Sequence, residues 1–253
     1  MVTIWDLRQA SRALAFGALA LGLAWLVTAA TDEGGVPWPE RAARTLPLAP
    51  VCAALGTWLA QARGWARGEG RTLAALGRAP LVASAPAVLG SALVAWAAAA
   101  AILLSSKVDV GGFFPVARRQ DAYVSEGDGV FVDTTTGDRI ERDGTIVKAP
   151  HGAAPPRAST ASNVPRRGRL AASLSTWALG LALTLLVARA ARGAKGLLLG
   201  LVAACAAAST LLFHAAAAHV VDALAAPLPA LALLAVAVVS TGSLGRSSLR
   251  EGS

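Results

Sequence analysis

The sequence predicts an all-α membrane bundle: six transmembrane helices, three on each side of a small β-meander insert that lies outside the membrane. Three observations lead to this fold class. Of 253 residues, 55% are hydrophobic and 15% are charged, and the apolar residues form long runs without amphipathic spacing. A single polar segment, 106–169, separates these runs into two groups of three. The chain therefore divides into 1–105, 106–169 and 170–253.

A spanning helix needs ~20 mostly apolar residues, and six segments reach or approach that length. They are Leu14–Thr28, Leu46–Gln61, Leu81–Leu104, Ala171–Val187, Leu197–His219 and Leu224–Ser240. The second and the fourth are the shortest, so their bounds are the loosest.

Basic residues orient the bundle, because short basic loops stay on the cytoplasmic side of a membrane. With the N-terminus inside, eleven of the 23 Lys and Arg residues fall in cytoplasmic segments, and only Arg41 and Arg44 fall in short outer loops. The other ten lie in the insert, and long domains translocate largely regardless of charge. Both termini are therefore predicted to be cytoplasmic. The net charge of +8 reflects this orientation, and nucleic acid is not expected as a partner.

The first thirty residues also fit a secretory signal peptide, since Arg8 and Arg12 precede an apolar stretch that ends in Val27-Thr28-Ala29-Ala30. Cleavage there would leave five spans, with the insert still outside. Cys52 and Cys205 fall within spans and are interpreted as packing residues. No His/Cys spacing in the sequence supports a disulfide or a metal site.

The insert has two unlike parts. Three short β-type runs, Ala122–Val124, Val130–Val132 and Thr145–Val147, predict a small β-meander. The turn signals between them are Gly127-Asp128-Gly129, Thr136-Gly137-Asp138 and Asp143-Gly144. From His151 to Arg167 the composition shifts to Pro, Ala, Ser and Arg, which predicts a linker.

The loop between the second and third spans, 63–80, carries the most specific local signal. Thr72 to Leu76 favours a short helix, Gly77 is suited to end it, and Glu69 stands where a negative charge suits a helix N-terminus. Leu73 and Leu76 are spaced i and i+3, which predicts one shared face. Two interpretations are open: a docking element for another protein, or an ordinary interfacial loop whose leucines enter the headgroup region.

Glu69, Leu73 and Gly77 reproduce a Glu-x3-Leu-x3-Gly spacing, and further landmarks follow in order. These landmarks are Leu46-Pro47-Leu48, Phe114-Pro115, Arg169-Leu170-Ala171, Arg192-Gly193 and Leu228-Pro229. In this order and in its layout the chain resembles the lipopolysaccharide-export permeases, the YjgP/YjgQ (LptF/LptG) family of ABC transporter membrane subunits. The resemblance covers most of the chain.

The resemblance implies a permease subunit of a lipid-export complex in the bacterial inner membrane, with a periplasmic insert and no enzymatic activity of its own. The loop helix would seat in a cytoplasmic ATPase dimer, with Glu69 as the contact, Leu73 and Leu76 as packing residues and Gly77 as the helix terminator. The sequence has no G-x-x-x-x-G-K-[ST] phosphate loop, so a separate subunit would hydrolyse ATP and no cofactor is expected.

Small residues recur on two spans and predict close helix–helix contacts. They are Ala18 and Gly22 on the first span, and Gly196, Gly200 and Ala204 on the fifth. The family pairs two permease halves through these spans, so a second half, identical or related, is an expected partner. Arg41, Arg44 and Arg169 are candidate contacts for a lipid phosphate. The insert, however, is much shorter than the family's outer domain, which leaves the identity of the transported lipid open.

Two other classes remain as alternatives. One is a non-transporting scaffold whose outer β-module binds a periplasmic β-protein by strand addition. The other is an intramembrane protease with Ser243 paired to His214 or His219. The sequence disfavours the protease, because Ser243 is predicted at the cytoplasmic face and His219 and Asp222 at the opposite one, ~30 Å apart.

Overall fold

We analysed a computed structural model that describes residues 3–31, 38–105, 108, 113–114, 123–133, 138–148, 166–190, 195–218 and 220–242. The N-terminal half contains the long helices α1 (Ile4–Thr31), α3 (Ala49–Ala66) and α5 (Pro80–Leu104), with the short α2 (Trp38–Thr45), η1 (Leu46–Leu48) and α4 (Glu69–Ala75) between them. The C-terminal half contains α6 (Arg166–Ala190), α7 (Lys195–Ala217), η3 (Ala223–Ala225) and α8 (Leu228–Gly242).

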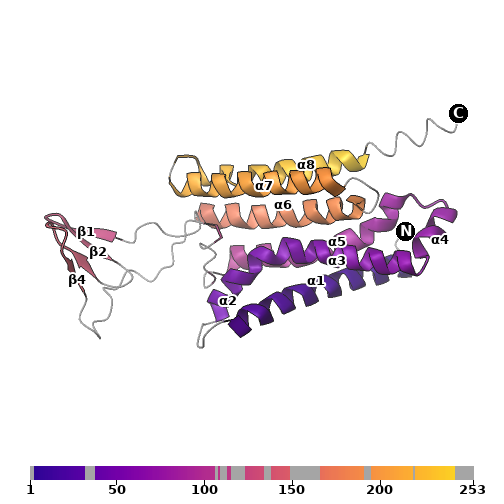
Figure 1. Ribbon diagram of the computed structural model, residues 1–253, viewed down its shortest axis with the longest axis horizontal. Helices are drawn as coiled ribbons and strands as arrows, with labels where there is room; N and C mark the ends of the chain where they lie inside the picture. Colours follow the sequence, from indigo (N-terminus) through magenta and orange to yellow (C-terminus); the bar gives the residue numbers. More distant parts are fainter. Residues whose placement is uncertain are drawn as a thin grey trace.

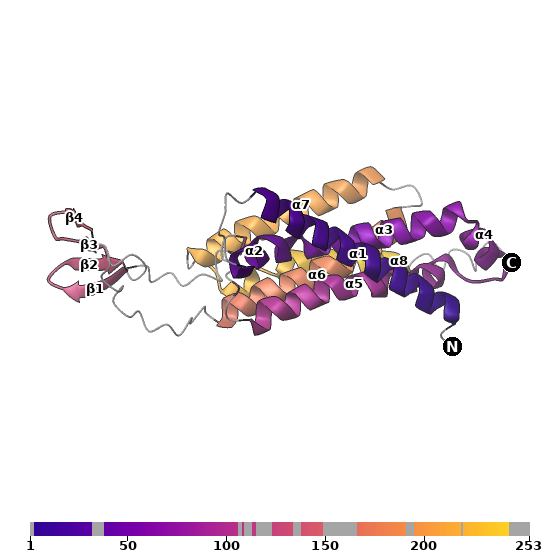
Figure 2. The same ribbon diagram turned by 90° about the horizontal axis from the view of Figure 1, so that it is seen from below.

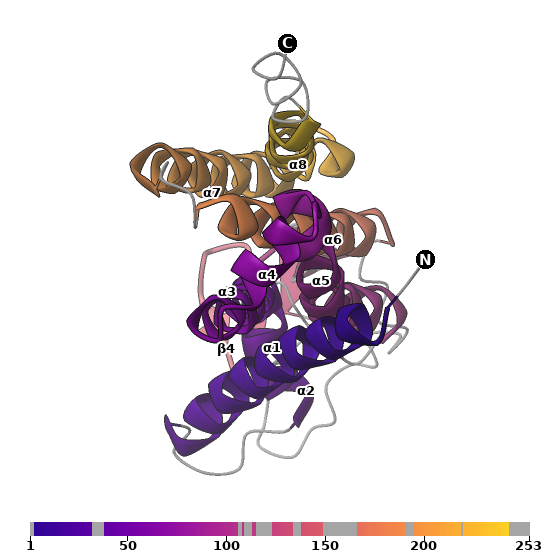
Figure 3. The same cartoon turned by 90° about the vertical axis from the view of Figure 1, so that its right-hand side faces the viewer.

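The long helices run side by side in one bundle. α1, α3 and α5 pack together on one side of α6, and α7 and α8 lie on its other side (Figure 3). Helix α1 begins and α8 ends at the end of the bundle that carries α4, whereas the strands lie beyond the opposite end (Figures 1 and 2). The insert and the 63–80 loop are therefore at opposite ends.

Five helical segments in the described part of the chain are long and apolar enough to cross a membrane. They are Ile4–Thr31, Val82–Leu104, Arg166–Arg189, Leu199–Ala217 and Ala223–Ser240. The second expected span corresponds to α3, which is absent from this set because its last turns carry Gln61 and Arg63. The fold is thus that of a multi-pass helical membrane protein, and the sixth crossing stays a prediction.

Small residues bring the helices of the first half into close contact. A Cβ added to Gly56 of α3 would come within 2.6 Å of the Ala13 carbonyl of α1. A Cβ on Gly90 of α5 would overlap the carbonyl of Ala10, and one on Gly180 of α6 would overlap the side chain of Ala95. These contacts are of the small-residue kind that packs helices in lipid.

Hydroxyl groups add hydrogen bonds between the same helices. The Thr57 and Ser91 hydroxyls bond across α3 and α5, and the Ser173 hydroxyl donates to the Ala99 carbonyl at 2.9 Å across α5 and α6. Cys52 and Cys205 are both buried and not joined in a disulfide, as the packing interpretation predicts.

The insert forms an antiparallel sheet in the order β1 (Tyr123–Gly127), β2 (Val130–Asp133), β3 (Arg139–Ile140) and β4 (Ile146–Val147). The meander is confirmed, and β3 is a strand that the sequence did not predict. Asp128 and Gly129 both have positive φ, 50° and 81°, as a tight hairpin turn requires. At the β3–β4 turn, the Thr145 hydroxyl and backbone N–H lower the pKa of the Asp143 carboxyl.

Candidate functional site

The 63–80 loop is a well-defined turn–helix–turn. Helix α4 starts at Glu69, one residue after Gly68, whose φ is +76°. It ends before Gly77, whose φ is +75°, and the Arg78 N–H donates to the Leu73 carbonyl at 3.0 Å. This is the Schellman arrangement in which a left-handed glycine ends a helix. The predicted helix and its terminator are confirmed, and the helix begins three residues earlier than predicted.

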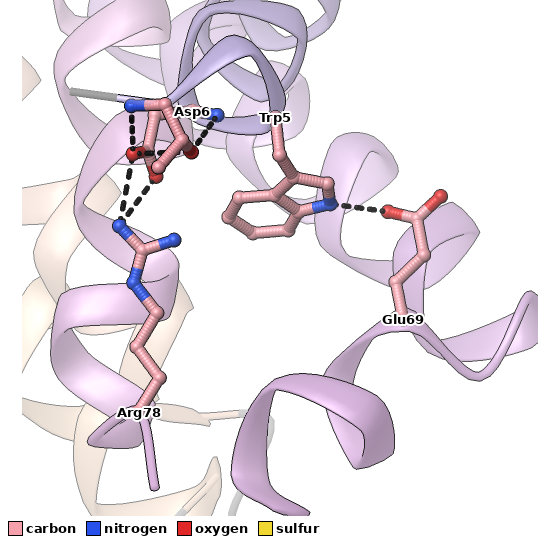
Figure 4. A network of polar contacts seen from close by, with 5 residues as sticks. Trp5, Asp6, Glu69 and Arg78 are labelled. Carbon is pink, nitrogen blue, oxygen red and sulfur yellow. Dashed lines mark hydrogen bonds and ion pairs between the residues drawn. The ribbon is translucent and has the colours of Figure 1, made fainter. Parts of the chain in front are cut away.

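The Glu69 carboxylate is held by side chains from the start of α1 (Figure 4). The Gln9 amide donates to Glu69 Oε2 at 2.8 Å, and the Trp5 indole N–H donates to the same oxygen at 3.2 Å. Arg12 and Arg67 lie 3.6 and 3.9 Å from Oε1. Glu69, with a side chain only 23% exposed, therefore joins α4 to α1.

A second contact ties the same loop to α1. The Arg78 guanidinium lies 2.7 Å from Asp6 Oδ1, and its carbon lies 5.5 Å from the centroid of the Trp5 ring (Figure 4). Asp6 also accepts from the Thr3 backbone N–H at 2.8 Å, while the Thr3 hydroxyl accepts from the Asp6 N–H at 3.3 Å. This reciprocal pair is a capping box, which places Asp6 for Arg78.

A cavity of about 80 Å³ lies between α1, α3, α4 and the start of α5. Glu69, Leu73 and Arg78 line it, together with Gln9 and Gln61. Gln9 Oε1 and Gln61 Nε2 are buried there without a hydrogen-bond partner within the chain. Because a buried water needs two to four polar partners, these two amide groups make the cavity suited to bound water.

The two predicted packing leucines of the loop have different surroundings. Leu73 lines the cavity, whereas Leu76 lies just beyond the last residue of α4 and is 77% exposed. The single shared face expected from their spacing is not present, because the helix ends at Ala75. Leu76 is thus the most exposed large apolar side chain of this loop, ahead of Trp65 at 53%.

The predicted helix-interface residues lie away from the core of the chain. Ala18, Gly22, Gly200 and Ala204 are exposed, and a Cβ added to Gly22 or Gly200 meets nothing within 4 Å. Gly196 lies in the first turn of α7. Ala18, Gly22, Gly200 and Ala204 are therefore open to another chain, and the close contacts within this chain use other small residues, such as Gly56 and Gly90.

Of the predicted lipid-phosphate contacts, Arg169 is 7% exposed and its guanidinium donates to backbone carbonyls at the end of α5. Its acceptors are Ile102 at 3.2 Å, Val108 at 2.8 Å and Ser105. A cation there satisfies carbonyls that a helix C-terminus leaves unpaired. Arg44 pairs with Glu40 at 2.8 Å on the exposed surface of α2, which also carries Arg41.

Two ionisable residues considered for other functions lie in the C-terminal half. Asp222 pairs with Arg167 at 3.5 Å and caps η3, and His214 lies in the last turn of α7. No group of three or more His, Cys, Asp or Glu residues suited to a metal ion occurs in the part that the structure describes. Other predicted features lie outside the described residues, among them Ser243, His219, Pro115, Arg192, Gly193 and the predicted linker up to residue 165. The last two residues of that linker, Arg166 and Arg167, are the first of α6, so the linker ends earlier than predicted.

The sequence reasoning missed Trp5, Asp6, Gln9 and Arg78 as parts of this site. One signal was present: Thr3 and Asp6 have the [ST]-x-x-[DE] spacing of a capping box directly before an apolar run. That pattern reveals the cap of α1. It does not reveal Arg78, which lies 72 residues away.

The fold and this site define a multi-pass membrane protein in which a short helix between two long ones is fastened to the start of the first long helix. No family model, curated protein or solved structure matches the chain.

Proposed function

We propose that this chain is the permease subunit of an ABC-type export complex for a lipopolysaccharide-like lipid, driven by a separate cytoplasmic ATPase. In this proposal α3 is the sixth crossing, both termini and α4 face the cytoplasm, and the sheet lies in the periplasm of a bacterium. A second permease half would pack on the exposed small residues of α1 and α7. Arg41 and Arg44, at the outer end, are the candidate contacts for the lipid phosphate.

The observation that carries the proposal is α4 itself. A helix of seven residues is too short to be stable alone in water. Here Gly77 ends it and Glu69 and Arg78 fasten it to α1, so it is ordered before any partner arrives. Preordering lowers the entropy lost on association, which is what a docking element needs. Leu76, at its tip, supplies an apolar anchor of the kind found at the centre of protein interfaces.

The experiment is affinity purification of the full chain in mild detergent, with identification of associated chains by mass spectrometry. We expect the wild type to retain an ATPase that contains a phosphate-binding loop, and Leu76→Glu to lose it. Val220→Glu is the matched control, because Val220 is equally exposed, at 76%, and lies in the α7–α8 connection at the opposite end. Retention of the ATPase by Leu76→Glu, or its absence from the wild type, would refute the coupling role.

The proposal also predicts that the purified chain alone does not hydrolyse ATP. A phosphate-release assay tests this directly. Turnover that persists after further purification would show that the chain is not the passive half of an ABC complex.

One observation favours the scaffold alternative. Cross-strand pairing puts Phe131, Ile140 and Ile146 in one row on the same face of the sheet, and Phe131 and Ile146 are 46% and 63% exposed. If the sheet binds a periplasmic protein, Ile146→Asp should remove that protein from the purified material and leave the ATPase. The two functions are thus separated by which variant loses which partner.

A further inference from the structure

Four arginines gather where the first turns of α1 meet the last turn of α3. Arg12 and Arg67 approach the same carboxylate oxygen, Glu69 Oε1, at 3.6 and 3.9 Å, which places their guanidinium groups close together. Arg8 lies one helical turn before Arg12 on α1, and Arg63 one turn before Arg67 on α3. Arg8, Arg12, Arg63 and Arg67 are called the arginine cluster below.

Arg63 reaches across to α1. Its guanidinium carbon lies 5.7 Å from the centroid of the Phe16 ring, and Phe16 lies one turn after Arg12. Since the four side chains come from adjacent turns of two packed helices, they form one basic surface along the α1–α3 contact.

The arginine cluster carries an excess of positive charge. Among the described carboxylates, Glu69 is the one that contacts the arginine cluster, so four guanidinium groups face one negative charge. Asp6, the other acidic residue nearby, is paired with Arg78. Arg8, Arg63 and Arg67 are all exposed.

The residues around the arginine cluster are of the kinds found at a membrane interface. Ile4 and Leu7 beside Arg8 are 75% and 67% exposed, and Trp65 of α3 is 53% exposed. Farther along α1, the exposed face is apolar. Tryptophan and arginine are typical of the headgroup level, and apolar side chains of the acyl-chain level below it.

We propose that the arginine cluster binds the phosphate of an anionic phospholipid, whose acyl chains lie against the exposed face of α1. A planar guanidinium donates two parallel hydrogen bonds to phosphate oxygens, and a basic surface beside a spanning helix attracts anionic headgroups. The excess charge selects a headgroup with net negative charge over a zwitterionic one. This site goes beyond the proposed function, because it requires membrane insertion but no ATPase.

The test is native mass spectrometry of the full chain in mild detergent, titrated with phosphatidylglycerol or phosphatidylcholine of identical acyl chains. We expect phosphatidylglycerol to bind at least about tenfold more tightly to the wild type, with a preference that falls as salt rises. The double variant Arg8→Gln/Arg63→Gln keeps both Glu69 ion pairs. At roughly fivefold per exposed guanidinium, its affinity for phosphatidylglycerol should fall about thirtyfold, while phosphatidylcholine binding stays unchanged.

Arg142→Gln is the control for a charge lost elsewhere, because it removes one exposed arginine from the β3–β4 turn and should bind phosphatidylglycerol as the wild type does. Equal binding of the two lipids by the wild type would overturn the proposal, and this comparison does not depend on how any variant folds. Undiminished phosphatidylglycerol binding by a folded double variant would overturn it too. Displacement of the lipid by millimolar inorganic phosphate would overturn the lipid assignment and make the arginine cluster a site for soluble phosphate. Loss of the ATPase in the preceding experiment would leave all of these results unaffected.

Discussion

Replacing Glu69 with Gln tests whether α4 is fastened to α1 through this carboxylate. Glutamine keeps an acceptor for Trp5 and Gln9 but has no charge. Each of those two bonds should fall from about 2 kcal/mol, typical of a charged acceptor, to about 1 kcal/mol. The part-exposed pairs with Arg12 and Arg67 add about 0.5 kcal/mol each. The expected loss is therefore about 3 kcal/mol.

The loss should appear as local opening of α4, because the contact between Asp6 and Arg78 stays in place. At 1.4 kcal/mol per tenfold, 3 kcal/mol raises the opening constant about a hundredfold, which hydrogen–deuterium exchange of the 69–75 amides measures. Glu69→Lys, which faces Arg12 and Arg67 with a third positive charge, should open α4 further.

Glu40→Gln is the matched control. It makes the same chemical change in an exposed i, i+4 pair with Arg44, and its own helix should lose no more than about 0.5 kcal/mol. Exchange of 69–75 in Glu69→Gln at the wild-type rate would refute the fastening of α4 by Glu69.

Three further predictions concern the bundle. Gly90→Ala should lower the free energy of unfolding by about 2 kcal/mol, because the new Cβ overlaps the Ala10 carbonyl. The midpoint of thermal unfolding in detergent should therefore fall by several degrees, and an unchanged midpoint would contradict the close α1–α5 packing. At Gly22 an added Cβ meets no atom within 4 Å, so Gly22→Leu should keep that midpoint and weaken association with the proposed second permease half; unaltered oligomer mass would remove α1 from that interface. Arg169→Met should lower the free energy of unfolding by about 3 kcal/mol, because the buried carbonyls of Ile102 and Val108 lose their donor. A thermal unfolding midpoint equal to that of the wild type would refute this capping role.

Local patterns predicted the parts of the fold that depend on neighbours in sequence. Gly77 ends α4 because a left-handed conformation suits glycine, and Gly127-Asp128-Gly129 forms the predicted turn for the same reason. The apolar runs predicted five of the long helices by composition alone. β3 was missed because Arg139 and Ile140 form a two-residue strand that exists only by pairing with its neighbours.

The candidate site depends on contacts that no local pattern contains. Arg78 is one of the basic residues that orient the bundle, and no local pattern indicates that it binds Asp6, 72 residues away. Arg169 was predicted at a lipid phosphate, and its burial against the end of α5 follows from how α5 and α6 pack. Glu69 was recognised from its spacing, but its inward hydrogen bonds to Trp5 and Gln9 require α1 to lie beside α4.

Those inward contacts sharpen the role of Glu69 in docking. If the ATPase binds Glu69 directly, docking must first break two charged hydrogen bonds of about 2 kcal/mol each and two ion pairs of about 0.5 kcal/mol each, about 5 kcal/mol together. In that case Glu69→Ala should lose the ATPase even where α4 stays ordered. Alternatively, Glu69 only holds α4 to α1, as an internal strut, and Leu76 is the contact with the ATPase. The variants Glu69→Gln, Glu69→Ala and Glu69→Lys should then lose the ATPase only to the extent that α4 opens. Leu76→Glu should then lose the ATPase while 69–75 exchange at the wild-type rate, because this exposed side chain does not line the cavity. The geometry favours the strut, and loss of the ATPase from a Glu69 variant with an ordered α4 would refute it.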